Sequence, residues 1–180
     1  SGSSLSSASY ALNKKYVVDD VATGKLIGSA GEEITFPTDG SNLDFIAYYP
    51  YQATAAGTLA YAVDVTDQSD FSKIDLLYSN NLTAKNQSST NLSLQFGHKL
   101  SMVSMEIGSQ NSFADMSNLT VKITGVKTTS SFNLVDGVTF TDGATTGEIT
   151  AVVTPRAGNA TAVVEAFVIP ATDLTGVQVG

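Results

Sequence analysis

The stretch SLQFGHKLSMVSMEI, residues 93–107, decides whether the fold is helical or extended. Four of its apolar residues fit a helical spacing: Phe96, Leu100, Val103 and Ile107. A period of two fits better, because apolar residues and His98 occupy every second position from Leu92 to Leu100, and Gly97 would weaken a helix. After Leu100 the apolar residues move to odd positions, which is the shift that a β-bulge produces. We therefore predict a bulged strand through this stretch.

The same alternation recurs elsewhere, in residues 43–49, 59–65 and 119–124. Residues 161–169, TAVVEAFVI, are apolar on both faces, which is typical of a central strand covered on each side, and Pro170 would end that strand. Residues 135–143, VDGVTFTDG, read as a short strand between two Asp-Gly turns. Turn signals recur at intervals of roughly ten residues. The pattern predicts an all-β fold, an antiparallel β-sandwich with little or no helix.

The most polar internal segment is SNNLTAKNQSSTN, residues 79–91. Its composition predicts a long loop or a connection between two lobes. A chain of 180 residues is long enough to bury a self-sufficient core. We expect residues 1–9 to form a flexible leader and residues 10–180 to form one β-sandwich domain. The alternative is two lobes with a break near residues 79–91.

Charge and composition exclude several classes of function. The net charge is −8, from 17 acidic and 9 basic residues, and the only adjacent basic pair is Lys14-Lys15. Nucleic acid and anionic lipid need clustered cations, so neither is expected as a partner. The chain has no cysteine, which excludes disulfides and thiolate chemistry. The longest apolar run, residues 162–171, is about half the length needed to span a bilayer, so no transmembrane segment is predicted.

No catalytic or metal-binding constellation can be assembled from the residue inventory. His98 is the sole histidine, and its register with Leu94 and Leu100 places it on the buried face of the strand, where a packed structural role is expected. One histidine without cysteine does not make a zinc site. Glu32 and Glu33 are adjacent and would point to opposite faces of a strand, so they cannot flank one glycosidic bond. We predict no catalytic residues, no metal, no cofactor and no enzymatic activity.

Two other clusters of polar or aromatic residues have simple structural interpretations. The acidic residues Asp64, Asp67 and Asp70 are spaced three apart, unlike the ligands of a calcium loop, and are read as turn formers. The tyrosines of AYYPYQ, residues 47–52, could stack on sugar rings, although aromatics before a proline are more often part of the core at a strand end. A monomeric surface adhesin or carbohydrate-binding module therefore stays open as an alternative function.

Five stretches carry a family resemblance when they are taken in order. They are LDFIAYYPYQ (43–52), IDLLYS (74–79), LSLQFGHKLSMVSMEI (92–107), SFNLVDG (131–137) and VVEAFVIPATDL (163–174). Together they resemble the fimbrillin-like family of bacterial surface pilus subunits. The residues that match the family motifs are Tyr48, Tyr49, Pro50, Asp75, Phe96, His98, Leu100 and Pro170.

The resemblance implies a fold and a function. It implies a transthyretin-like, Greek-key-like β-sandwich that serves as a structural subunit of a fimbria or pilus in cell adhesion, with His98 as a structural residue. Such subunits are exported as lipoprotein precursors and lie at the outer membrane and cell surface. The expected partners are other pilus subunits, joined as homo- or hetero-polymers by a donated strand, with host or bacterial surface ligands as further candidate partners.

Overall fold

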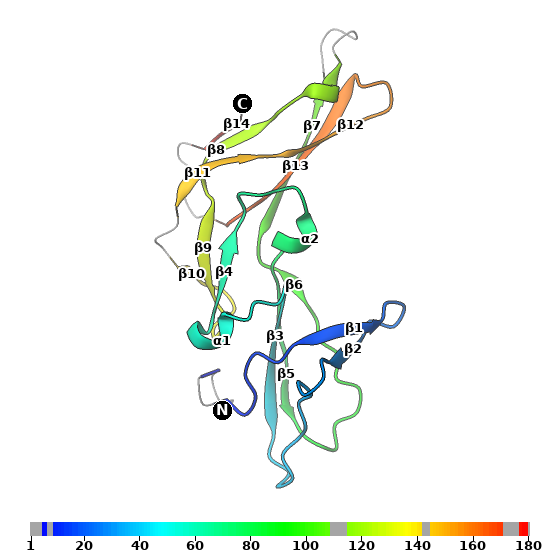
Figure 1. The fold of residues 1–180 in the computed structure, drawn as a ribbon, viewed down its shortest axis with the longest axis vertical. Coiled ribbons are helices and arrows are strands. Elements are labelled where there is room, and N and C mark those ends of the chain that lie inside the picture. The colour runs from blue at the N-terminus through cyan, green and yellow to red at the C-terminus, as the bar shows by residue number, and fades with distance from the viewer. Residues whose placement is uncertain (1–4, 7–8, 109–114, 142–144, 171–176, 180) are drawn as a thin grey trace.

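The computed structural model describes residues 5–6, 9–108, 115–141, 145–170 and 177–179. The described residues form antiparallel strands, two four-residue helices and one 3-10 turn (Figure 1). The strands are β1 (Tyr16–Asp20), β2 (Lys25–Gly28), β3 (Leu43–Tyr49), β4 (Ala60–Asp64), β5 (Leu77–Lys85), β6 (Gly97–His98), β7 (Ser101–Gly108), β8 (Lys122–Lys127), β9 (Thr129–Asn133), β10 (Phe140–Thr141), β11 (Thr146–Thr150), β12 (Val152–Pro155), β13 (Thr161–Val168) and β14 (Gln178–Val179). The helices are α1 (Ala55–Thr58) and α2 (Phe71–Ile74), and the 3-10 turn is η1 (Met116–Asn118). The prediction of an all-β antiparallel sandwich with little helix is confirmed.

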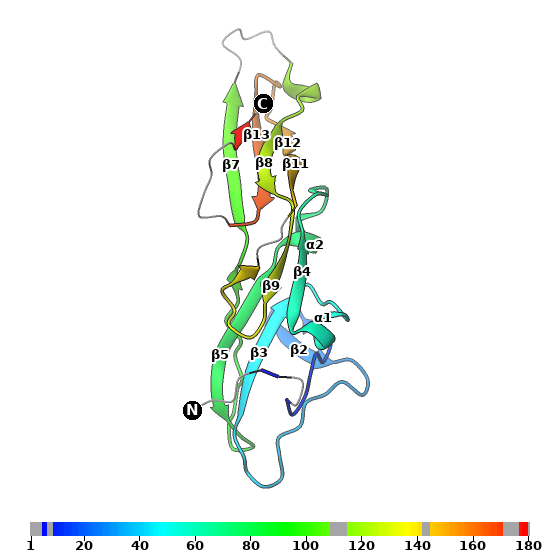
Figure 2. The same cartoon turned by 90° about the vertical axis from the view of Figure 1, so that its left-hand side faces the viewer.

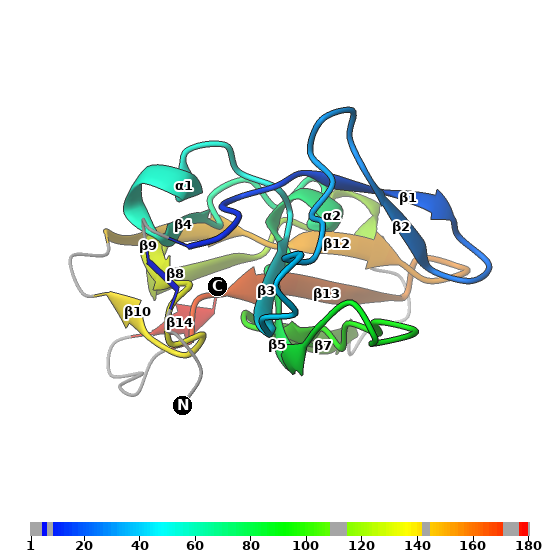
Figure 3. The same cartoon turned by 90° about the horizontal axis from the view of Figure 1, so that it is seen from below.

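The strands form two layers, each made of two sections along the long axis. The first layer contains the sheet β12-β13-β7 at one end and the sheet β3-β5-β6 at the other. The second layer contains β11-β8-β14 and β10-β9-β4. In Figure 2, β7 lies above β5 on the same side of the molecule, so the first layer runs through both sections. The separate hairpin β1-β2 projects away from both layers (Figure 3).

A single residue, Thr128, links the two sections of the second layer, because it lies between β8 and β9. The Thr128 amide donates to the Thr145 carbonyl oxygen at 2.8 Å, beside β11. The Thr128 carbonyl oxygen accepts from the Val65 amide at 2.9 Å, at the end of β4. Because β8 and β9 continue through this residue, one extended strand serves two sets of neighbours.

Aromatic rings join the two layers across the core. Phe132 on β9 is fully buried, and its ring centroid lies 5.6 Å from that of Tyr78 on β5, edge to face. Tyr48 on β3 meets Tyr61 on β4 in the same way, also at 5.6 Å. Edge-to-face pairs add about 0.5–1.5 kcal/mol beyond the burial of their area. The buried residues form one hydrophobic cluster that reaches both sections of the sandwich.

Strand β13 is covered on both faces, as its sequence predicted. Ala162, Val164 and Ala166 face the interior and are buried. On the outer face, the ring of Phe71 in α2 packs edge to face on Phe167 at 5.1 Å. Helix α2 begins where the Asp70 side chain accepts the Ser72 amide. The central position of residues 161–169 is therefore confirmed.

Two expectations about the middle of the chain are wrong. Residues 79–85 belong to the nine-residue strand β5 and not to a long loop. Residues 92–96 are not a strand; only β6 and β7 form in the stretch 92–107. Residues 79–85 are extended because they pair with β3. The side chain of Asn81 accounts for the second difference, because it donates to the Ser93 carbonyl oxygen at 2.9 Å and accepts from the Gln95 amide at 3.0 Å. A polar residue of β5 thus replaces the regular backbone ladder.

The remaining strand predictions are confirmed, with different bounds for β4, β8 and β10. Strand β3 covers residues 43–49, β4 lies within residues 59–65, and β8 starts at Lys122, after the turn η1. The short strand in residues 135–143 is β10, while Asp142 and Gly143 lie outside the described residues. Most of the expected leader, residues 1–9, also lies outside them, although Leu5 packs against the core cluster. The division into one domain or two lobes stays a prediction.

The turn at Gly137 gives a test of the interlayer packing. Gly40 and Gly137 both have positive φ, 79° and 67°. A Cβ atom at Gly137 would lie 2.2 Å from Cε1 of Tyr78, whereas nothing lies within 4 Å of one at Gly40. We expect Gly40→Ala to cost about 1–2 kcal/mol of backbone strain, and Gly137→Ala to cost about 1–3 kcal/mol more because the Tyr78 ring must move. Urea unfolding of both variants measures the difference, and equal losses would contradict the close approach.

Candidate functional site

Three of the family-motif residues, Tyr48, Tyr49 and His98, lie in two rows across the sheet β3-β5-β6. Tyr48 pairs with Tyr78, and Tyr78 pairs with Gly97. This row faces the interior, where both tyrosine rings contact the second layer. The next residues along each strand, Tyr49, Leu77 and His98, pair in the same order. Because successive side chains point to opposite faces, this second row faces outward.

The structure places His98 outside the core, so the prediction of a packed, buried histidine is wrong. Its side chain is 67% exposed, and Nδ1 lies 2.9 Å from Oδ1 of Asp75. A single period of two does not run through Leu94, His98 and Leu100, because these residues do not lie in one strand. Strand β6 is only two residues long, and the chain turns at Lys99, whose amide donates to the Leu76 carbonyl oxygen at 2.8 Å. Leu100 is therefore buried although its strand neighbour His98 is not.

The other motif residues have mixed environments. Phe96 is exposed, although it was expected on the buried face, and Pro170 is exposed beyond the end of β13. Tyr49 is 46% exposed, and Tyr51 is also exposed beneath the Lys15 amine, which lies 5.5 Å from its ring centroid. Within the described ranges no three acidic or histidine side chains come close enough to hold a metal ion. The motif residues thus lie in different environments, and Tyr48, Tyr49 and His98 share the sheet β3-β5-β6.

Tyr48 is the centre of a hydrogen-bonded junction. Its hydroxyl contacts Oδ1 of Asn13 and the carbonyl oxygen of Gln52, the latter at 2.9 Å. The Asn13 amide donates to the same Gln52 oxygen at 2.9 Å. Burial raises the pKa of Tyr48, and burial raises the pKa of the neighbouring Tyr61 to about 12. Both phenols are therefore uncharged at neutral pH. The hydrogen bonds of Tyr48 fix the N-terminal segment to the turn after β3.

The acidic residues of DVTDQSD form turns, as predicted. Asp64, Asp67 and Asp70 each accept the backbone amide two residues ahead, at 2.9, 2.9 and 3.1 Å. Hydrogen bonds from Ser69 and Ser72 lower the pKa of Asp67 and Asp70. Because each carboxylate serves its own turn, the three do not gather around a common point.

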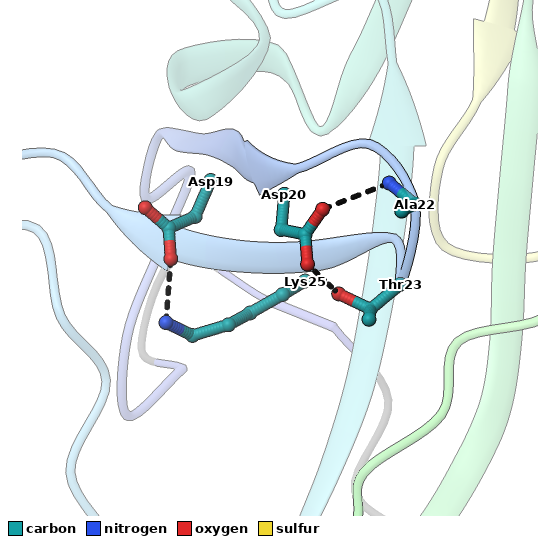
Figure 4. Close-up of polar contacts among 5 residues, drawn as sticks. All are labelled: Asp19, Asp20, Ala22, Thr23 and Lys25. Atoms are coloured by element: carbon teal, nitrogen blue, oxygen red, sulfur yellow. Dashed lines mark hydrogen bonds and ion pairs between the residues drawn. The ribbon is translucent and has the colours of Figure 1, made fainter.

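The hairpin β1-β2 exposes apolar side chains on both of its faces. Val17 pairs with Ile27 on one face and Val18 with Leu26 on the other, and all four are exposed. Its turn is closed by polar contacts (Figure 4). Lys25 pairs with Asp19, and Asp20 accepts the Ala22 amide at 2.9 Å and the Thr23 hydroxyl at 2.8 Å. This exposed hairpin was not predicted from the sequence.

Strand β7 lies at the edge of the first layer. It pairs with β13 on one side, and among the described residues no strand pairs with its other side. Val103, Met105 and Ile107 face the core but are only half-buried, while their partners on β13 are fully buried. The alternate residue Met102 points outward and is 47% exposed. The structure thus presents an eight-residue edge whose inner face is apolar and incompletely covered.

A sequence model described as fimbrillin-like matches residues 1–179 of this chain. The chain belongs to the fimbrillin-like family. Fimbrillin-like proteins are structural proteins. Membership of this family confirms the prediction that the chain is not an enzyme.

Two relatives from Bacteroides uniformis (ATCC 8492) are similar to this fimbrillin-like chain. One is named "Putative fimbrium subunit Fim1C"; it is 34% identical over 139 residues, which cover 74% of this chain and 46% of the relative. The other is a crystal structure described as "a putative cell adhesion protein"; it is 30% identical with a TM-score of 0.79, over 92% of this chain and 64% of that chain. The fimbrillin-like chain spans about half the length of the curated relative that it matches. Within the residues described, no helix is long and apolar enough to cross a membrane.

Replacing His98 tests its exposed placement. Because exposed ion pairs contribute little, we expect His98→Ala to lower the free energy of unfolding by less than about 1 kcal/mol. The matched variant Leu100→Ala, at a position that is 6% exposed, should cost about 2–5 kcal/mol through loss of burial and an internal cavity. Urea unfolding compares the two. A His98 loss as large as that at Leu100 would contradict its place on the outer face.

The turn-forming carboxylates predict how stability depends on pH. The pKa values of Asp67, Asp70 and Asp136 are lowered in the folded chain by hydrogen bonds. Such groups stabilise the fold above the pKa of the unfolded state, and this contribution is lost as the pH falls through the folded value. We expect the free energy of unfolding to decrease as the pH drops below about 4. Unfolding measured at several pH values tests this, with Asp70→Asn as a variant that should show a shallower decline; stability that rises toward low pH would contradict it.

Proposed function

We propose that this chain is a structural subunit of a bacterial cell-surface fimbria and takes part in adhesion. Family membership and the printed names of the two relatives support the assignment to fimbriae and adhesion. The observation in the structure that carries the proposal is the incompletely covered edge of β7. Within the proposal, subunits join by strand donation, and β7 is the edge that accepts the donated strand.

The inner face of β7 determines what kind of strand it would accept. Val103, Met105 and Ile107 recur at every second residue and pack against the core cluster. A donated strand would hydrogen-bond to the free side of β7 and would place apolar side chains at the same period of two beside them. The half-buried row would then be covered as fully as its partners on β13.

The energy available to such a joint is sufficient for a stable, non-covalent polymer. Burying about five apolar side chains contributes on the order of 1.5–3 kcal/mol each, or roughly 10 kcal/mol before the costs of ordering and association. Backbone hydrogen bonds along β7 would add direction and register. Covering the edge would also remove a site at which unrelated strands could pair.

The location and the partners follow from the same proposal. The subunit is exported, begins as a lipoprotein precursor and is held at the outer membrane as part of the fimbria. Its principal partners are other pilus subunits, identical or different. The exposed hairpin β1-β2 and the outward row of Tyr49, Leu77 and His98 are the surfaces available to further ligands on host or bacterial cells.

Charge on the inner face of β7 tests strand acceptance. We expect Met105→Asp to reduce incorporation into surface polymer at least about tenfold, because the donated strand would have to bury an unpaired carboxylate. The measurement is the amount of the subunit in heat-resistant, high-mass polymer on its source cell, together with electron microscopy of the fimbriae.

The matched control is Met102→Asp, which places the same charge on the outer face of the same strand. It should assemble normally. Secreted monomer levels and unfolding midpoints of both variants separate loss of assembly from loss of folding. Normal assembly of a folded Met105→Asp subunit would exclude β7 as the acceptor, and adhesion that persists without polymer would favour the alternative of a monomeric surface adhesin.

A further inference from the structure

The outer edge of β4 carries backbone groups that no strand pairs with in the described part of the chain. Strand β4 pairs with β9 on one side only. At its two ends, the Leu59 carbonyl oxygen accepts the Leu134 amide at 3.1 Å and the Val65 amide donates to Thr128 at 2.9 Å. Because antiparallel ladders use alternate residues, Ala60, Ala62 and Asp64 turn their N–H and C=O groups to the other side. That side is the outer edge of the second layer.

The side chain of Gln52 occupies this edge at its midpoint. Its Nε2 donates to the Ala62 carbonyl oxygen at 2.7 Å, and its Oε1 accepts from the Ala62 amide at 2.9 Å. A primary amide offers the same donor and acceptor as a peptide group, so these two bonds reproduce those that one residue of a neighbouring strand would make. At the preceding outward position, the Thr58 hydroxyl donates to the Ala60 carbonyl oxygen at 3.1 Å.

The backbone of Gln52 is held in place from the opposite layer. Its carbonyl oxygen accepts from the Tyr48 hydroxyl and from the Asn13 amide, each at 2.9 Å. The Tyr48 ring packs on Tyr61, which belongs to β4 itself. The amide is therefore aimed at Ala62 by the junction that joins the two layers.

We propose that Gln52 is a specificity-determining residue for strand addition: its amide closes the β4 edge and so excludes donated strands, or strands of a second copy, from that position. The inference rests on the proposed function and deepens it, because it concerns which edges admit a strand. No side chain among the described residues makes a comparable pair of bonds to the free side of β7. Within the described part of the chain, one edge is thus capped by a side-chain amide and another is not.

The test uses the chain in solution and compares three variants. Gln52→Leu keeps the size of the side chain and removes both bonds. Its matched control, Gln87→Leu, places the same apolar group at an exposed loop position. Gln52→Leu/Ala62→Lys adds a charged side chain to the open edge, which blocks strand pairing without restoring the amide bonds.

For Gln52→Leu we expect amide hydrogen exchange at Ala62 to accelerate and self-association to increase at least about tenfold in analytical ultracentrifugation. Gln87→Leu should match the parent chain, and Ala62→Lys should return the Gln52→Leu variant to the monomer. Unchanged exchange and association in a folded Gln52→Leu would overturn the proposal. Association that Ala62→Lys does not reverse would overturn it as well, because it would trace to general destabilisation.

A further variant separates this inference from the proposed function. Adding Met105→Asp to Gln52→Leu should leave the association in solution unchanged, because that association uses β4 and not β7. Loss of association in this double variant would overturn the role of the β4 edge. Normal assembly of Met105→Asp alone on cells would instead count against β7 as acceptor and leave the Gln52 result standing.

Discussion

The contact between Tyr78 and Phe132 is the constraint on which the rest of the structure depends. It joins a strand of each layer at the centre of the core, and it leaves Phe132 without exposed surface. The Tyr78 hydroxyl donates to the Leu134 carbonyl oxygen at 3.1 Å, and the bare Cα of Gly137 lets the chain pass against the ring. Burial raises the pKa of Tyr78, which keeps it a neutral donor. Once Tyr78 faces inward, its strand neighbour Leu77 and the residues paired with Leu77 must face outward.

This register explains which features could be predicted from the sequence. A period of two is decisive where a strand has one covered face and a long ladder, as in β3 and β13. It failed at His98, because the face of a two-residue strand is set by its partner Tyr78 and not by the period of its own segment. In β5 the wrong prediction came from polar composition: residues 79–85 form a strand, and Asn81 directs its side chain to the backbone of residues 93–95. A polar composition does not reveal that such a side chain replaces the backbone hydrogen bonds between two strands.

Apolar alternation alone also cannot tell a covered strand from an exposed one. The segment 161–169 and the hairpin β1-β2 are both apolar on two faces, yet the first is central and the second projects from the sandwich (Figure 3). The difference lies in what the rest of the chain supplies. Phe71 covers the outer face of β13, whereas the hairpin pairs only with itself among the described residues. Burial is thus decided by residues distant in the sequence.

Two glutamine side chains hydrogen-bond to strand backbone at places where no neighbouring strand does so in the described structure. Strand β12 stops pairing with β13 at Glu165, and there the chain crosses from the second layer to the first. The Gln68 side chain, 4% exposed, takes the vacated place: its Oε1 accepts the Phe167 amide at 2.8 Å and its Nε2 donates to the Phe167 carbonyl oxygen at 3.1 Å. Gln52 makes the same pair of bonds at Ala62, on a surface and not in the core. At Phe167 the amide satisfies groups that water cannot reach, so it is required by folding. At Ala62 water could satisfy the same groups. There the amide therefore affects strand addition at the β4 edge more than it affects the stability of the fold.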